Sequence, residues 1–78
     1  MNNHFLTKDL SLAGMLYAKD VPFVGVNRTG RLCHFVFENP QDCEKLQQQF
    51  FSGTVDVSAR KYADALRVLK DLVFANER

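Results

Sequence analysis

Apolar residues recur with helical spacing over the first twenty positions of the chain. The spacing predicts a helix from about Lys8 to Lys19, with Thr7 as its N-cap and Asp9 favouring its amino end. One stripe of this helix is made of Leu6, Leu10, Ala13 and Tyr17. Further apolar residues lie outside the stripe: Leu12, Met15 and Leu16. A helix that is apolar over most of its circumference is either central in its domain or covered by a second chain.

An extended apolar run after Val21-Pro22 predicts a β-hairpin. Its first strand covers residues 23–26, its turn residues 27–30 and its return strand residues 31–38. Both strands are rich in the aromatic and β-branched residues that are typical of sheets.

The turn decides which hairpin residues share a face. A two-residue Thr-Gly loop would force Thr29 to a positive φ, which is costly for a β-branched residue. A three-residue loop with Gly30 in the left-handed conformation is therefore favoured, and it pairs Asn27 with Arg31. One face then carries Phe23, Cys33, Phe35 and Phe37, and the other carries Val24, Val26, Leu32, His34 and Val36. Because both faces are apolar, the hairpin requires helices on both sides or a partner chain on one.

The second half of the chain predicts two further helices. One starts at Asn39-Pro40 and ends at Ser52-Gly53, and the other is capped by Ser58. Residues 54–57 between them are extended and form a candidate third strand. The order is therefore α-β-β-α-(β)-α. We expect the whole chain to be one α+β domain in which an antiparallel β-hairpin packs with three helices and residues 1–5 are frayed.

Composition and charge narrow the choice of function. The chain has 78 residues, 46% of them hydrophobic, and ten Lys and Arg against nine Asp and Glu leave a net charge of +1. A core this small has little surplus stability, which favours a homo-oligomer. The sequence shows no secretory signal and no apolar run long enough to cross a membrane. Two cysteines are too few for a disulfide scaffold, so we expect a cytoplasmic protein with reduced thiols and no membrane partner.

No group of residues has the spacing of a catalytic or metal site. Cys33 and His34 are neighbours on a strand, so their side chains point to opposite faces and cannot reach one ion. The interval from Cys33 to Cys43 fits no common zinc motif, and the four glycines form no phosphate-binding loop. No carboxylate is placed to orient His34 as a general base. We therefore expect a protein that is not an enzyme, with no catalytic, cofactor-binding or metal-binding residues and no cofactor.

Basic residues near the hairpin turn and along the last helix support an alternative, a nucleic-acid-binding accessory or regulatory protein. Its contacts would be Arg28, Arg31, Arg60, Lys61 and Lys70. Along the last helix, however, Asp64 and Asp71 alternate with the basic residues, which is typical of a solvated ion-pair ladder. Those carboxylates would repel a phosphate backbone, so nucleic acid is not the favoured partner.

Several short segments resemble a bacterial protein family. They are Thr7-Lys8-Asp9-Leu10, Val24-Gly25-Val26, Phe35-Val36-Phe37-Glu38, Phe51-Ser52-Gly53, and Tyr62 with Leu66-Arg67-Val68-Leu69-Lys70. Through them the chain resembles a short domain-of-unknown-function family over nearly its whole length, from Phe5 to about Phe74. The resemblance implies a bacterial, phage or mobile-element origin, and it carries no assigned activity, cofactor or catalytic residue.

These observations favour a small non-enzymatic protein-interaction module that associates with itself. The hairpin and the first helix motivate the hypothesis, because one short chain has difficulty covering the apolar surface of both. The expected interaction face comprises Val24, Val26, Leu32, His34, Val36, Leu12 and Met15.

Overall fold

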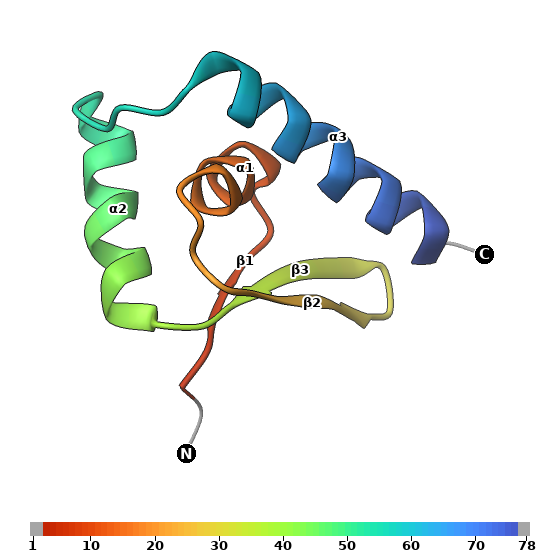
Figure 1. Ribbon diagram of the computed structural model, residues 1–78. Coiled ribbons are helices and arrows are strands. Elements are labelled where there is room, and N and C mark those ends of the chain that lie inside the picture. The colour runs from red at the N-terminus through yellow and green to blue at the C-terminus, as the bar shows by residue number, and fades with distance from the viewer. Residues whose placement is uncertain (1–2, 77–78) are drawn as a thin grey trace.

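Three helices lie on one side of a small antiparallel sheet in the computed structural model, which describes residues 3–76 (Figure 1). In chain order the elements are β1 (Phe5–Thr7), α1 (Leu10–Ala18), β2 (Phe23–Thr29), β3 (Leu32–Phe37), α2 (Pro40–Ser52) and α3 (Ala59–Asn76). The α+β class is therefore confirmed. Of the residues expected to be frayed, 1 and 2 lie outside the described residues, and Phe5 opens β1.

The third strand of the sheet is β1, and the candidate strand at residues 54–57 does not form. β1 pairs with β3, with Phe5 opposite Phe37 and Thr7 opposite Phe35, so the strand order is β1-β3-β2. Residues 54–57 lie on the other side of α1 from the sheet, where the described chain offers no strand to pair with (Figure 1). An extended segment becomes a strand only when a partner strand can accept its backbone hydrogen bonds.

The N-cap of α1 is Asp9 and not Thr7. One oxygen of the Asp9 carboxylate accepts hydrogen bonds from the backbone N–H groups of Ser11 at 2.9 Å and Leu12 at 3.3 Å. Its negative charge also suits the amino end of a helix. Thr7 lies in β1 instead, and its hydroxyl accepts the Asp9 N–H at 3.1 Å. The two side chains together hold the short link between β1 and α1.

Asp9→Ala is expected to lower the free energy of unfolding by about 1 kcal/mol, because two backbone donors at the start of α1 lose their acceptor. Asp9→Asn keeps a side-chain oxygen at this position and should lose less. Urea unfolding followed by circular dichroism measures both changes. An unfolding midpoint that Asp9→Ala leaves unchanged would show that the cap does not stabilise the fold.

The hairpin loop contains two residues, Gly30 and Arg31, so the predicted pairing of Asn27 with Arg31 is wrong. Thr29 ends β2 and pairs with Leu32, which begins β3. Gly30, with a φ of 60°, takes the first loop position, where type II′ turns favour glycine. In this loop the residue with a positive φ is Gly30. Thr29 lies in β2 and is free of the strain expected for it in a Thr-Gly loop.

A β-bulge at Val24 changes which side chains face the helices. After the bulge Val26 lies opposite Phe35, and before it Phe23 also faces the helices. Gly25 has a φ of 152°, a conformation that side chains with a Cβ rarely adopt, so the bulge favours glycine there. Val26 therefore packs toward the core, and the prediction that it shares a face with Val24 is wrong.

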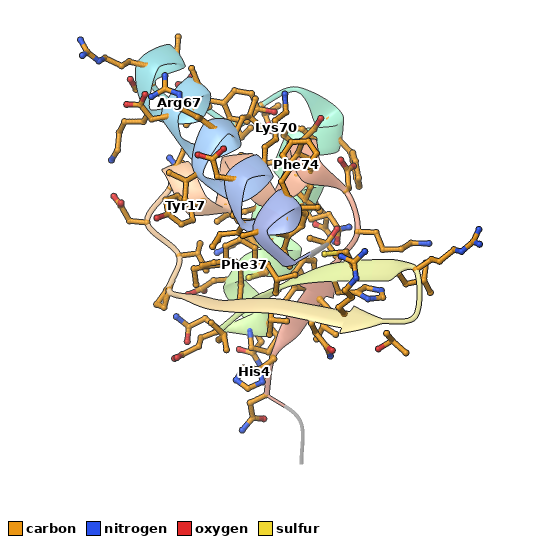
Figure 2. All side chains as sticks on the ribbon, turned by 90° about the vertical axis from the view of Figure 1, so that its right-hand side faces the viewer. His4, Tyr17, Phe37, Arg67, Lys70 and Phe74 are labelled. Carbon is orange, nitrogen blue, oxygen red and sulfur yellow. The ribbon has the colours of Figure 1, made fainter. Side chains whose placement is uncertain are left out.

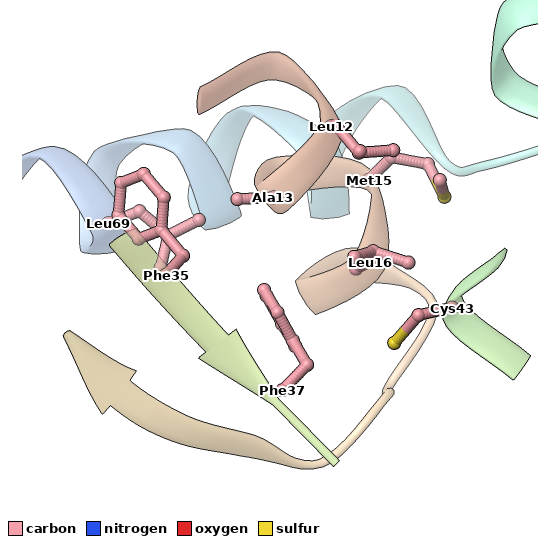
Figure 3. Packing of buried hydrophobic residues seen from close by; sticks show 8 residues of the cluster. All are labelled: Leu12, Ala13, Met15, Leu16, Phe35, Phe37, Cys43 and Leu69. Atoms are coloured by element: carbon pink, nitrogen blue, oxygen red, sulfur yellow. The ribbon is translucent and has the colours of Figure 1, made fainter. Parts of the chain in front are cut away.

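α1 is the centre of the core. Six of its nine residues are buried, and the sheet, α2 and α3 surround it (Figures 1 and 3). The buried cluster comprises Leu12, Ala13, Met15, Leu16, Phe35, Phe37, Cys43 and Leu69. The sequence predicted that α1 is either central in the domain or covered by a second chain, and the structure shows that it is central. Leu12 and Met15 are wrong as interaction-face residues, because the rest of this chain covers them.

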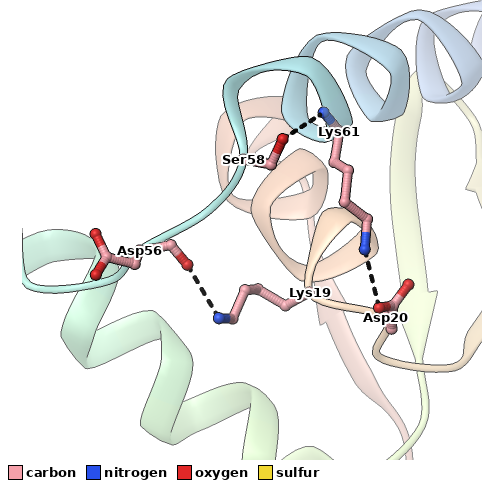
Figure 4. Close-up of polar contacts among 5 residues, drawn as sticks. All are labelled: Lys19, Asp20, Asp56, Ser58 and Lys61. Atoms are coloured by element: carbon pink, nitrogen blue, oxygen red, sulfur yellow. Dashed lines mark hydrogen bonds and ion pairs between the residues drawn. The ribbon is translucent and has the colours of Figure 1, made fainter.

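Polar contacts position the start of α3 beside the end of α1 (Figure 4). The Ser58 hydroxyl accepts the Lys61 N–H at 3.4 Å, which agrees with the predicted cap. The Lys61 ammonium lies 3.1 Å from the Asp20 carboxylate, and the Lys19 ammonium donates to the Asp56 carbonyl at 3.0 Å. Exposed contacts of this kind add little stability, so we assign them a role in orienting the link before α3.

Candidate functional site

One face of the sheet is not covered by any helix of the described chain. α1, α2 and α3 all lie on the inner side of the sheet (Figure 1), and the strand positions that point away from them carry Leu6, Val24, Gly25, Asn27, Thr29, Leu32, His34 and Val36. We call this set the outer face. Val24 and Leu32 are each 50% exposed and Leu6 is 38% exposed, whereas Val36 on the central strand is 8% exposed. Large aliphatic side chains gathered on an open sheet face are typical of a surface that contacts a partner.

The structure distributes the predicted interaction residues over three places. The outer face contains Val24, Leu32, His34 and Val36. Val26 is half-buried on the inner face, and Leu12 and Met15 are in the core. Leu6 belongs to the outer face and was missed, because it also fits the helical stripe. The signal that could have found it is the alternation Phe5-Leu6-Thr7, in which the middle residue points outward.

The outer face contains no acidic side chain, no lysine and no arginine. Its polar members are Asn27, Thr29 and His34. In a dimer with a two-fold axis, a surface packs against the same surface of the second copy. If the surface carried charged side chains, like charges of the two copies would face each other. An apolar face without acidic side chains, lysine or arginine avoids that repulsion.

A second feature is an apolar hollow on the inner side of the hairpin, which we call the α3 hollow. Its volume is about 470 Å³, and it is lined by Lys8, Leu10, Cys33, Phe35, Lys70, Val73 and Phe74. Figure 2 shows Lys70 and Phe74 on the same side of α3, above the hairpin. Sequence reasoning missed the hollow because its lining comes from the β1–α1 link, α1, β3 and α3, which are far apart in the chain.

The two cysteines are both free thiols in different surroundings. Cys33 is half-buried on β3 and lines the α3 hollow. Cys43 is fully buried on α2, and its thiol donates to the Glu38 carbonyl at 3.3 Å. Burial, together with the nearby charges of Asp42 and Glu44, raises the pKa of Cys43 to about 11. At neutral pH Cys43 is therefore a neutral, unreactive thiol, and Cys33 is the accessible one.

Comparison with known protein families identifies the family of the chain. A family model described as a domain of unknown function, DUF5659, matches residues 2–75. The chain belongs to the DUF5659 family. The predicted resemblance to a short domain-of-unknown-function family is confirmed. Neither the curated proteins nor the solved structures include a match to the chain.

The basic residues of the nucleic-acid alternative lie at separate places on this DUF5659 domain. Arg28 and Arg31 are near the hairpin tip, which lies toward the opposite end of α3 from Arg60 and Lys61 (Figure 1). Lys70 is about 15 Å along α3 from Arg60, at 1.5 Å per residue. Lys61 is also paired with the Asp20 carboxylate. Arg60 and Lys61 are therefore separated from the cations at the hairpin end of α3, and nucleic-acid binding stays a prediction.

Residues 3–76 of the DUF5659 domain bear on two other kinds of site, a metal centre and a membrane-spanning segment. Within that range, no three His, Cys, Asp or Glu side chains are grouped so that they could hold a metal ion. No helix there combines the length and the apolar character needed to cross a membrane. His34 does not line the α3 hollow. That the protein is not an enzyme stays a prediction.

Proposed function

We propose that this DUF5659 domain is a non-enzymatic interaction module of the cytoplasm that forms a homodimer through the outer face of its sheet. The observation that carries the proposal is the uncovered outer face with its exposed aliphatic side chains. The two free thiols support a reducing compartment, since disulfides form and persist in oxidising ones.

A second copy of the chain fits the outer face better than a charged partner does. The face has no Asp, Glu, Lys or Arg to pair with an opposite charge, and it has no like charges to repel its own copy. Two sheets pack face to face at about 10 Å, with their side chains interdigitating. Val36 would lie near the centre of such an interface, with Leu6, Val24 and Leu32 around it.

The dimer is expected to depend on concentration. Few large side chains of each copy are exposed on the outer face, so the buried area is small compared with that of obligate dimers. Light scattering after size-exclusion chromatography, over a range of protein concentrations, is therefore the direct measurement.

Val24→Lys combined with Leu32→Lys is expected to convert the dimer to a monomer. The two substitutions remove apolar contacts and bring four ammonium groups toward one another across the two-fold axis. Both positions are half exposed, so the monomer should keep its fold and its circular dichroism spectrum. A matched control, Gln41→Lys with Gln48→Lys, adds the same charge on exposed positions of α2 and should remain dimeric.

Two outcomes would overturn the proposal. If the parent protein stays monomeric at millimolar concentration, the proposed homodimer does not form. A parent dimer that survives Val24→Lys with Leu32→Lys uses a different surface.

A further inference from the structure

The α3 hollow results from a difference in length between two helices. α3 has 18 residues and α1 has nine, so α3 is about 27 Å long and α1 about 13 Å long. The carboxyl-terminal turns of α3 therefore extend past α1 and lie over the hairpin with no helix between (Figure 1). Their apolar residues Val73 and Phe74 face Cys33 and Phe35 across the gap, which Leu10 closes at the start of α1.

The walls of the hollow are apolar, and they remain open to solvent. Phe74 is 63% exposed, although it lies beside buried Phe35. A volume of about 470 Å³ falls within the range of about 300–1,000 Å³ that is typical of small-molecule sites. An apolar chain entering the hollow would cover both this phenylalanine and the half-buried side of Leu10.

Two of the residues that line the hollow are lysines. Lys8 and Lys70 both line it, and within the described residues neither has a hydrogen-bond or ion-pair partner. Lys19 and Lys61 differ from them, because each donates to an oxygen elsewhere in the chain. Among the described residues that line the hollow, none is Asp or Glu.

We propose that the α3 hollow binds an amphipathic anion, namely a medium-length acyl or alkyl chain with one anionic group. The apolar chain lies between α3 and the hairpin, and the anionic group is placed between the ammonium groups of Lys8 and Lys70. Such a ligand satisfies both properties of the site, since its tail buries apolar surface and its head pairs with two ammonium groups that have no ion-pair partner among residues 3–76. This site lies on the inner side of the hairpin and is independent of the outer face.

Decanoate, kept below its micelle concentration, is the first probe. Its addition to labelled protein is expected to shift the backbone amide signals of residues that line the hollow, above all Cys33, Val73 and Phe74. Decanol has the same chain without the charge and should bind more weakly. Decyltrimethylammonium has the opposite charge and should bind least.

Lys8→Gln combined with Lys70→Gln is expected to weaken decanoate binding about tenfold, because two exposed ion pairs are lost. The variant should also lose the preference for decanoate over decanol. The matched control, Lys45→Gln with Arg60→Gln, removes two positive charges elsewhere and should bind decanoate as the parent does. The dimer-breaking variant Val24→Lys with Leu32→Lys should also bind normally, which separates this proposal from that of the homodimer.

Alkylation of Cys33 by iodoacetamide gives a second measurement at the site itself. Decanoate in the hollow should slow the reaction of Cys33, while buried Cys43 stays unmodified in the folded protein. Shifts spread over the outer face, equal binding of decanoate and decanol, or an alkylation rate that saturating decanoate does not change would each overturn the proposal.

Discussion

Phe37→Ala is expected to lower the free energy of unfolding by about 3–5 kcal/mol, the usual cost of deleting a buried phenylalanine side chain. Phe37 is fully buried on the central strand β3 (Figure 3). Its ring centre lies 5.2 Å from that of Phe23, which in turn contacts Tyr17 of α1 at 5.6 Å. The deletion leaves a cavity where the sheet meets α1, because the neighbouring rings can close it only in part.

That loss is comparable with the whole stability expected of a chain of this size, at about 0.05–0.15 kcal/mol per residue. Urea unfolding should therefore show Phe37→Ala partly or wholly unfolded without denaturant. Phe51→Ala makes the same chemical change at a side chain that is 65% exposed, and it should cost less than about 1 kcal/mol. Phe37→Leu retains most of the side-chain volume and should remain folded. If Phe37→Ala does not fold, the stability of Phe37→Leu can be measured in its place. Equal losses for Phe37→Ala and Phe51→Ala would contradict the structure.

Gly14→Val is expected to lower the free energy of unfolding by about 2–3 kcal/mol through overpacking between α1 and α3. A Cβ at position 14 would lie 2.7 Å from Cδ2 of Leu66, and 3.3 Å from both Cγ of Leu66 and Cε1 of Tyr62. Optimal carbon–carbon contacts are about 3.5–4.0 Å, so α3 would have to move away. The move would also stretch the hydrogen bond of 3.1 Å from the Tyr62 hydroxyl to the Ser11 carbonyl.

Two comparisons separate overpacking from helix propensity. Gly14→Ala adds only the Cβ, which the terminal methyl of Leu66 can avoid by rotating, and alanine favours the helix by about 0.5–1 kcal/mol over glycine. Its net effect should therefore be small. Ser11→Val introduces the same β-branched side chain at an exposed position of α1 and should change stability by less than about 0.5 kcal/mol. A Gly14→Val variant as stable as Ser11→Val would show that α1 and α3 are not in close contact at residue 14.

Local signals in the sequence predicted the helices well. The predicted start of the second helix at Asn39-Pro40 and its end at Ser52-Gly53 agree with α2, and the Ser58 cap agrees with α3. Even here the mechanism differs in one detail, because Asn39 has a φ of 57° and makes no side-chain cap hydrogen bond. Proline and the terminating glycine define these ends through their own backbone preferences, which need no distant contact.

The candidate sites could be predicted only in part. Alternation along β3 correctly separated Phe35 and Phe37 from His34 and Val36, because neighbouring strand residues always point to opposite faces. The two-residue loop and the bulge at Val24 were not predicted, and they place Val26 on the inner face. The α3 hollow could not be predicted at all, since it depends on how far one helix extends past another.

The sequence by itself determined the class of the fold, the strongly apolar character of α1 and the presence of a hairpin with apolar residues on both faces. Those properties follow from periodicity, caps and turns, which act over a few residues. Only the tertiary structure decided that Phe5–Thr7 supplies the third strand, that this chain covers α1 by itself, and that the outer face of the sheet stays open. The physical reason is that the hydrophobic effect is non-directional. An apolar residue in the sequence indicates that it should be buried, but which element covers it depends on how all the elements pack together.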